Sequence, residues 1–290
     1  MLCIVRAAFQ RAWDCTLERG AHDAEHRFAV RLGFRQVQGL SEEELEKLVA
    51  ARGNGYASIE RLAAVAGVSR FTIERLAEAN AFRSLRLDRR AALWAARRIG
   101  TIGLNAIATR KTPMDRPLPL FAAHVDDALF SEPDVALAPM PLGEQVAEDY
   151  VATSLSLKDH PVSFFREQLV QLGALRNVDH RGETLPQNQR VTVAGLVLTR
   201  QMPGAKGVVF VTLEDETDIA NIIVWPKVFA RNRRVVMTSR FLAVRGRLQR
   251  AGLVVHVLAE SFVDLSAELP RLYGDDLLSD LPLLKSRDFH

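Results

Sequence analysis

Five short apolar runs dominate the second half of the chain, and each run favours a β-strand. They are rich in β-branched residues, and turn signals at Pro203-Gly204, Asp215-Glu216 and Ala251-Gly252 separate several of them. The runs are VTVAGLVLTR, GVVFVTLED, IANIIVWP, RFLAVRGRL and LVVHVL. Between the third and fourth runs, Pro226 to Arg234 favours a short helix. Five strands with one helix inserted there predict a closed β-barrel of the OB type over residues 186–265.

Helical spacing dominates the first half of the chain. Ser41 with Glu44 three residues on forms a capping box that opens a first helix. A second helix follows Ser58, a third runs through Ile73, Leu76 and Ala77, and a fourth is expected to start at Asp88. Tight turns at Gly39-Leu40-Ser41 and Gly67-Val68-Ser69 complete two helix-hairpin-helix units over residues 31–100. The fold class expected is therefore α+β multidomain, with this helical region followed by the five-stranded OB-fold barrel.

Three further segments complete the predicted organisation. Residues 101–141 are rich in Pro and Ala and show little periodicity, which indicates a linker. Residues 142–185 are expected to form a helical connector with a break at His160-Pro161, and residues 266–290 form a C-terminal tail.

Positive charge is concentrated in the predicted barrel. Residues 190–250 hold eleven Lys and Arg against four Asp and Glu, whereas the whole chain has a net charge of only +3. A local positive field of this kind is typical of a phosphate-binding face. The residues expected to contact phosphates are Arg200, Lys206, Arg245 and Arg247.

Aromatic side chains of the same region are candidates for stacking on bases. Phe210 and Phe241 alternate with aliphatic residues, so an outward orientation would place them on the open face of the barrel. Alternatively they fill the barrel or pack under its helix. Among the aromatic residues, Trp225, next to Pro226, is the one for which such burial is most expected.

The second helical turn is the other DNA candidate. Gly67, Val68, Ser69 and Arg70 would present backbone N–H groups and a helix N-terminus to a phosphate. Alternatively the turn only connects two helices. The first turn is assigned to structure, because the acidic run 42–44 follows it and would repel a phosphate.

The linker carries the motif RPLPLFA at residues 116–122. Its apolar side chains Leu118, Leu120 and Phe121 could enter a groove of a partner protein at small ordering cost, because the prolines restrict the free chain. Alternatively Leu120 and Phe121 pin the linker to a neighbouring domain.

Composition excludes several classes of protein. With 48% hydrophobic and 25% charged residues, the chain has the composition of a soluble globular protein, and no apolar run approaches the roughly 20 residues of a membrane span. Met1 to Trp13 lacks the features of a signal peptide, so a cytoplasmic location is expected. Cys3 and Cys15 form neither a disulfide framework nor a CxxC zinc site. No catalytic or metal-binding residue is predicted.

Several segments together resemble a known family. They are WDCTLE at 13–18, AVRLGFRQVQGL at 29–40, AFRSLRLDRRAALWAAR at 81–97, LPLFAA at 118–123, SLSLKDHPVSFFR at 154–166, the barrel runs and the closing KSRDFH. They are similar to the C-terminal region of bacterial error-prone DNA polymerases, C-family enzymes related to the replicative α subunit. Residues 1–30 would then be the remnant of an upstream polymerase region. The resemblance implies translesion synthesis during damage-induced mutagenesis, with a sliding clamp and a Y-family-like mutagenesis partner as associates.

In this family the palm carboxylates that bind magnesium lie upstream of the matched region. The expectation is therefore a DNA-binding and partner-interaction fragment without catalysis and without a cofactor of its own, which holds single-stranded or primer-template DNA. Two alternatives stay open. The chain could be one piece of a split, catalytically competent polymerase completed by another polypeptide, or a protein-interaction module that binds no DNA.

Overall fold

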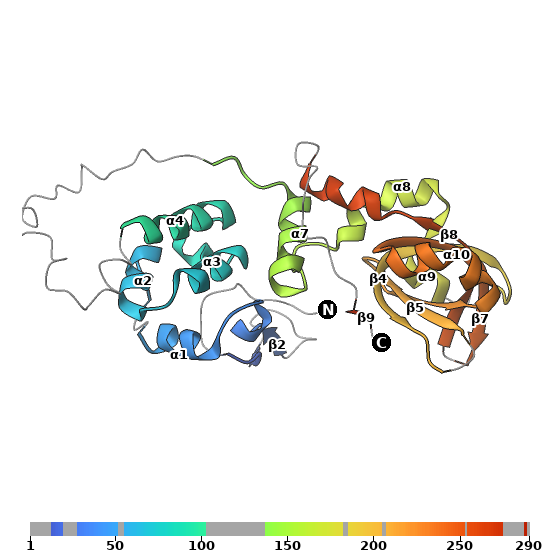
Figure 1. Cartoon of the computed structure of the whole chain (residues 1–290), viewed down its shortest axis with the longest axis horizontal. Coiled ribbons are helices and arrows are strands. Elements are labelled where there is room, and N and C mark those ends of the chain that lie inside the picture. Colours follow the sequence, from blue (N-terminus) through green and yellow to red (C-terminus); the bar gives the residue numbers. More distant parts are fainter. Residues whose placement is uncertain are drawn as a thin grey trace, which may run out of the picture. The chain divides into compact units, whose positions relative to one another are not determined.

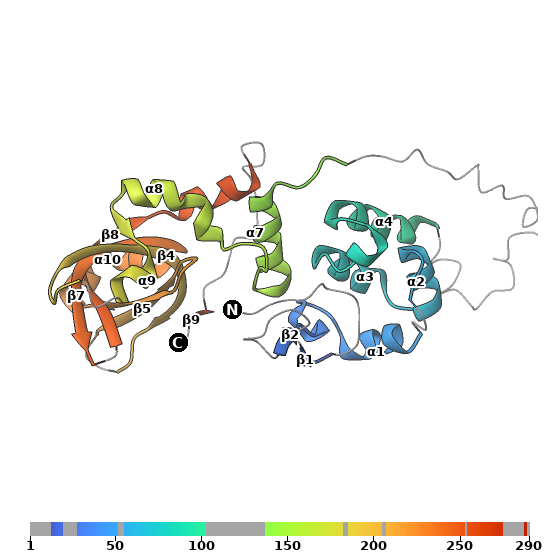
Figure 2. The same cartoon turned by 180° about the vertical axis from the view of Figure 1, so that it is seen from behind.

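The computed structural model describes residues 13–19, 28–51, 55–102, 137–181, 185–204, 207–252, 254–274 and 287–288. The chain divides into two compact units, residues 1–140 with 152–155, and residues 141–151 with 156–290. Figure 1 and Figure 2 show the first as mainly helical and the second as built around a β-barrel. The predicted fold class, a helix-hairpin-helix region followed by an OB-fold, is confirmed.

The helical unit is formed by four α-helices around one apolar core. The helices are α1 (Glu42–Ala51), α2 (Ile59–Ala66), α3 (Arg70–Glu78) and α4 (Arg89–Ile102), with single 3-10 turns η1 (Phe34–Gln36) and η2 (Arg83–Leu85). Leu48, Ile73 and Leu76 are fully buried among them. A two-stranded antiparallel sheet, β1 (Thr16–Arg19) and β2 (Phe28–Arg31), precedes them. Because η1 is one turn long, the first hairpin has a full helix on only one side.

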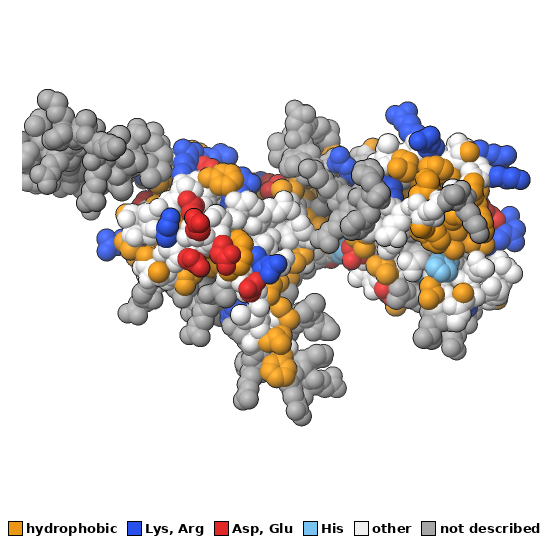
Figure 3. Space-filling model, turned by 60° about the horizontal axis from the view of Figure 1, so that its bottom comes forward, with side chains coloured by type: hydrophobic (Ala, Val, Ile, Leu, Met, Phe, Trp, Pro, Cys, Tyr) orange, Lys and Arg blue, Asp and Glu red, His pale blue; other side chains and the backbone are white. Residues whose placement is uncertain are grey.

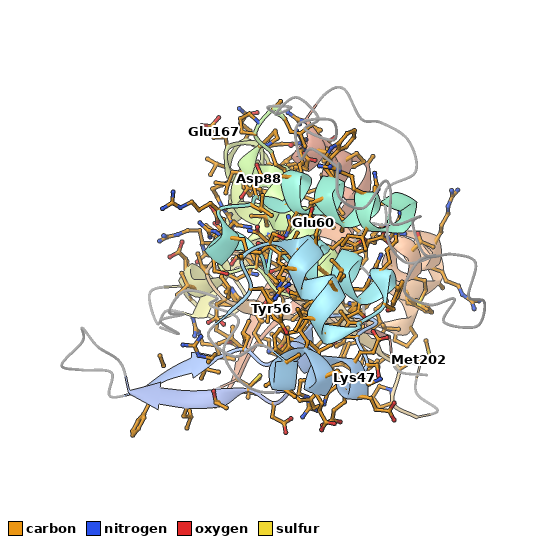
Figure 4. The ribbon with its side chains drawn as sticks, turned by 90° about the vertical axis from the view of Figure 1, so that its left-hand side faces the viewer. Lys47, Tyr56, Glu60, Asp88, Glu167 and Met202 are labelled. Carbon is orange, nitrogen blue, oxygen red and sulfur yellow. The ribbon has the colours of Figure 1, made fainter. Side chains whose placement is uncertain are left out.

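Capping hydrogen bonds and a left-handed glycine explain where the predicted helices begin and end. The hydroxyl of Ser58 accepts a hydrogen bond from Arg61 N at 3.1 Å, and Asp88 Oδ1 accepts one from Ala91 N at 2.8 Å. Gly67 ends α2 in the left-handed conformation with φ +61°. Tyr56, labelled with Asp88 in Figure 4, donates its hydroxyl proton to Leu48 O at 2.6 Å and so joins α1 to the start of α2.

The second unit contains a closed five-stranded barrel. Its strands are β4 (Arg190–Gln201), β5 (Val209–Glu214), β6 (Ile219–Val224), β7 (Phe241–Ala251) and β8 (Val254–Asp264). They follow the order β4-β5-β6-β8-β7, and β7 pairs again with β4 to close the barrel. Alternate side chains such as Val193, Ile222 and Val257 fill the interior. Helix α10 (Pro226–Thr238) is inserted between β6 and β7 and packs against β8.

Two glycines allow strands of the barrel to approach closely. A side-chain carbon on Gly195 would lie 2.4 Å from Glu214 O, and one on Gly246 would lie 2.2 Å from Leu258 O. Neither distance is compatible with a side chain, so both positions need glycine for the strands to keep this spacing.

Short helical elements of the connector cover one part of the barrel's outer surface. They are α7 (Leu142–Thr153), η4 (Pro161–Phe165), α8 (Arg166–Gln171), α9 (Asn177–Arg181) and, after β8, η5 (Ser266–Tyr273). Strands β3 (Ala174–Leu175) and β9 (Arg287–Asp288) add to β4 in parallel. Leu169 and Leu269 of these elements form a second core with Leu196 of the barrel. The break at His160-Pro161 predicted for this region lies at the start of η4.

A charged cluster joins the connector to the turn between β5 and β6. The guanidinium of Arg166 donates to both carboxylate oxygens of Glu216, each at 2.7 Å, and to Asp215 Oδ2 at 2.9 Å. Asp215 is buried and also accepts hydrogen bonds from backbone N–H groups, including that of Asn177 at 2.8 Å. Burial raises the pKa of Asp215, but hydrogen bonds from Thr217, from Asn177 and within the turn outweigh it and hold the pKa below its ordinary value.

Candidate nucleic-acid interface

The strand register places one continuous row of side chains on the outside of the barrel, running across four of its five strands. Phe210 on β5 pairs with Ile223 on β6, Ile223 pairs with Leu258 on β8, and Leu258 pairs with Arg247 on β7. Phe210 is 36% exposed, Arg247 is exposed, and the two aliphatic side chains between them are half-buried. We call these four residues the apolar row. It joins an aromatic side chain at one end to a cation at the other.

A second row of polar side chains lies beside the apolar row. Thr212 pairs with Asn221, Asn221 with His256, and His256 with Gln249. These hydroxyl, amide and imidazole groups can hydrogen-bond to bases or to the sugar-phosphate backbone. Sequence reasoning missed them, although the alternation of polar and apolar residues in IANIIV and LVVHVL was the available signal. Figure 3 shows hydrophobic side chains gathered between Lys and Arg side chains on one face of the barrel unit.

The cations beside the apolar row differ in their partners. Glu260 on β8 accepts from Arg247 Nε at 2.8 Å and from Arg190 Nε at 3.2 Å. The hydrogen bond from Arg247 and the nearby charge of Arg190 hold the pKa of Glu260 below its ordinary value. Arg245 is exposed and has no ion pair within the described part of the chain. A phosphate would therefore meet an unpaired cation at Arg245 and compete with a carboxylate at Arg247.

Arg200 does not lie on this face, and the prediction that it contacts phosphates is wrong. It is 5% exposed, and its Nε donates to Val236 O at 2.6 Å while Nη2 donates to Ser239 O. A β-bulge between Val197 and Thr199 reverses the strand parity, so Arg200 faces inward opposite Val211. Its charge lies at the C-terminus of α10, where the helix dipole favours a cation.

Phe241 is also removed from the interface. Its side chain is 0% exposed and packs against Phe165 of the connector, with ring centroids 5.4 Å apart. Phe241 has the same strand parity as Arg245, so it does point away from the barrel interior as the alternation predicts. The connector covers that end of β7, and Phe241 therefore belongs to the second core instead of a base-stacking surface.

Trp225, unlike Phe241, is exposed to solvent. It is 52% exposed at the end of β6, so neither the barrel nor α10 encloses it. Phe210 and Trp225 are thus the aromatic side chains that are exposed in the described part of the barrel. Lys206 and the three linker residues Leu118, Leu120 and Phe121 lie outside the described residues.

The second helical turn has a neighbour that the sequence did not reveal. The carboxylate of Glu44, from α1, accepts hydrogen bonds from Ser69 N at 3.3 Å, from Ser69 Oγ at 2.9 Å and from Thr72 Oγ1. Burial raises the pKa of Glu44, but the hydrogen bonds from Thr72 and Ser69 outweigh it, and the pKa lies below its ordinary value. An anionic group therefore already lies at the N-terminus of α3.

This carboxylate weakens the case for a phosphate site at the turn. Val68 is buried, the Ser69 hydroxyl caps Thr72 N at 3.2 Å, and Arg70 pairs with Glu74 at 2.8 Å. Glu74 is the next acid after the turn along the chain, but folding brings Glu44 into contact with Ser69. The predicted capping box assigned the Glu44 carboxylate to the N-terminus of its own helix, α1, whereas in the structure it accepts hydrogen bonds at the N-terminus of α3. Gly67, Val68, Ser69 and Arg70 are best explained as a connection between helices.

Comparisons with known proteins agree with both fold units. Residues 9–92 match the family described as helix-hairpin-helix motif, and residues 191–265 match the OB-fold nucleic acid binding domain. Error-prone DNA polymerase 1 of Rhizobium meliloti is 49% identical over 273 residues, which covers 89% of this chain and 23% of the relative. The resemblance to error-prone DNA polymerases is confirmed. The error-prone DNA polymerase of Sinorhizobium medicae is 50% identical over 244 residues, covering 84% of this chain and 21% of the relative.

The error-prone DNA polymerases that this chain matches are much longer than the chain itself. The error-prone DNA polymerase of Caulobacter vibrioides is 46% identical over 309 aligned positions, which include 96% of this chain and 27% of the relative. The chain thus spans about a quarter of the length of the error-prone DNA polymerases that it matches. In the part of the chain that the structure describes, no helix is both long and apolar enough to cross a membrane. The same residues contain no group of three or more His, Cys, Asp or Glu arranged to hold a metal ion.

Proposed function

We propose that this chain binds single-stranded DNA through the outer face of its barrel, as part of the DNA-handling region of an error-prone DNA polymerase. The observation that carries the proposal is the apolar row, in which exposed Phe210 and Arg247 lie at opposite ends of one line across three strand pairs. A base stacked on an aromatic side chain gains about 1–3 kcal/mol, whatever the base. Arg247 at the other end of the row, with Arg245 next to it on β7, supplies the positive charge for the phosphates.

The polar row and Arg245 extend the same face. Thr212, Asn221 and His256 each lie two residues along their strand from a member of the apolar row. They are therefore placed to hydrogen-bond to a strand stacked on Phe210. Arg245 lies two residues along β7 from Arg247 on the same side of the strand, where it adds a cation without a competing carboxylate. The face thus combines stacking, hydrogen bonding and charge, the three interactions that OB-folds use on single strands.

A titration of the full chain with a labelled oligothymidylate tests this proposal. Phe210→Ala should weaken binding about 5- to 150-fold, which corresponds to the loss of one stacked base. Phe164→Ala is the matched control, because Phe164 is 40% exposed but lies on η4 outside the two rows. Arg245→Gln should lower the salt slope by about 0.7 on logarithmic axes, and Arg247→Gln should lower it by less, because Glu260 competes with the phosphate for Arg247. Equal affinities of the two Phe variants, or an unchanged slope, would remove this face from the site.

The proposal assigns no catalysis to this chain. Nucleotidyl transfer through two metal ions needs a fixed group of acidic ligands, and the described residues contain none that fits magnesium. The purified chain should therefore not extend a primer on a template when magnesium and nucleotides are supplied. Extension above a blank preparation would contradict this part of the proposal and favour the alternative of a catalytically competent piece.

The cellular role proposed is translesion synthesis in damage-induced mutagenesis, with a sliding clamp and a Y-family-like protein as partners. Support comes from the similarity to error-prone DNA polymerases and from the place of the motif ending in Leu120 and Phe121, which lies in the sequence between the helix-hairpin-helix and OB-fold matches. A peptide of residues 115–124 should bind the clamp weakly, with a Kd of about tens of micromolar or poorer, because Pro117 lacks a side-chain amide. Binding should be lost when both Leu120 and Phe121 are replaced by Ala. No binding at millimolar peptide would identify the motif as a linker anchor.

A further inference from the structure

Helix α10 carries a charge pattern that the barrel fold itself does not require. Its sequence PKVFARNRRVVMT contains four cations and no acid. The apolar side chains Val228, Phe229, Val235 and Val236 pack against the barrel core, while all four cations are exposed. Within the described residues, none of these cations forms an ion pair with a carboxylate. Packing explains the apolar side of α10. On the charged side, Arg234 helps to lower the pKa of Asp264 through its charge but forms no ion pair with it in the described part of the chain.

Three of the four cations form one stripe. Lys227, Arg231 and Arg234 are separated by four and three residues, so they lie on the same side of the helix. Arg233 lies roughly a third of a turn away from this stripe. Asn232 departs from helical geometry, with φ −122° and ψ 18°. Val228 and Phe229 before it and Val235 and Val236 after it nevertheless all pack against the barrel core, so the same side of α10 faces the barrel in both halves. The stripe covers about 10 Å along the axis, which is the length of about three stacked nucleotides.

The stripe begins where the outer face of the barrel ends. Ile223 of the apolar row and exposed Trp225 are two residues apart, and Trp225 directly precedes α10. The loop between β4 and β5 also reaches this junction, because a side-chain carbon on Gly207 would lie 3.7 Å from Pro226 Cγ. A strand stacked on Phe210 and leaving the sheet past Trp225 would thus meet the first turn of α10 next.

We propose that Lys227, Arg231 and Arg234 form a second phosphate-binding segment, which continues the path of a single strand from the apolar row, over Trp225, along α10. The ligand is the phosphodiester backbone of single-stranded nucleic acid. This inference rests on the proposed function, because the path starts on the proposed DNA-binding face. It adds that the binding site is longer than that face and that the added part is electrostatic.

Two oligothymidylates, of about 6 and about 12 nucleotides, separate the two parts of the path. The full chain and its variants are titrated with each oligonucleotide over a series of salt concentrations. For the longer one, Arg231→Gln and Arg234→Gln should each lower the salt slope by about 0.7, and the triple variant with Lys227→Gln by about 2. For the shorter one, which the apolar row can hold alone, the slopes should stay unchanged. Trp225→Ala should likewise weaken binding of the longer oligonucleotide more than that of the shorter one.

Arg233→Gln is the matched control. Arg233 is next to Arg234, equally charged and exposed, but lies off the stripe, so its variant should keep the slope of the unmodified chain. Equal losses for Arg233→Gln and Arg234→Gln would overturn the inference, because they would indicate a general effect of net charge. Equal losses for the two oligonucleotides would overturn it too, since the stripe would then not lengthen the site. If the unmodified chain bound neither oligonucleotide, the proposed function itself would fail.

Discussion

Glu44 offers a sharp test of how the helical unit is held together. Its carboxylate accepts three hydrogen bonds from Ser69 and Thr72 at the N-terminus of α3, although it belongs to α1. Glu44→Gln keeps the shape but removes the charge. Hydrogen bonds to charged groups exceed neutral ones by about 1 kcal/mol or more, and a carboxylate near a helix N-terminus adds about 0.3–1 kcal/mol. We expect the free energy of unfolding of the helical unit to fall by about 1–3 kcal/mol.

The control for this variant is Glu43→Gln. Glu43 is exposed in the same first turn of α1, so its loss removes only the interaction with that helix's own dipole, about 0.3–1 kcal/mol. Denaturant unfolding of the full chain, followed by far-ultraviolet circular dichroism, measures both. If Glu44→Gln unfolds at the same denaturant concentration as Glu43→Gln, the bonds to α3 contribute nothing and the reasoning is refuted.

The pH dependence of this effect has a definite sign. The folded-state pKa of Glu44 lies below its ordinary value of 4.5. Its contribution is therefore complete above the ordinary pKa and is lost as the pH falls through the folded pKa. The stability difference between the unmodified chain and Glu44→Gln should be constant near neutral pH and should shrink in acid. A difference that grows in acid would contradict the assignment of an ionised carboxylate at the N-terminus of α3.

Two further predictions concern the barrel unit. Arg166→Ala should lower its free energy of unfolding by about 2–4 kcal/mol in denaturant titrations, because the fully buried Asp215 side chain loses its cation. Arg176→Ala, which breaks an exposed pair with Asp179, should lower the free energy of unfolding much less, and equal losses would contradict a special role of the Arg166 cluster. Glu260→Gln should tighten binding of oligothymidylate and steepen its salt dependence, because two arginines beside the apolar row lose their competing carboxylate. Glu268→Gln, which breaks an exposed pair with Arg271, should leave both unchanged, and weaker binding by Glu260→Gln would count against the interface.

Local sequence determined the elements of this protein and many of their ends. Alternation of apolar residues predicted the five strands, and their order around the inserted helix predicted the OB barrel, because strand period and turn chemistry are short-range properties. Ser58 and Asp88 start helices, and Gly204 and Gly252 adopt positive φ in the predicted turns, for the same reason. The resemblance to error-prone DNA polymerases was also a property of the sequence alone.

Tertiary structure decided which predicted site residues are accessible. Parity placed Phe241 on the outside of its strand, but the connector covers it, through contacts with residues such as Phe165 far away in the chain. A single bulge turned Arg200 inward, and one carboxylate from α1 took the position expected for a phosphate at α3. Strand and helix periods assign a side chain to one side of its own element. What lies against that side depends on long-range packing, which the local pattern of residues does not encode.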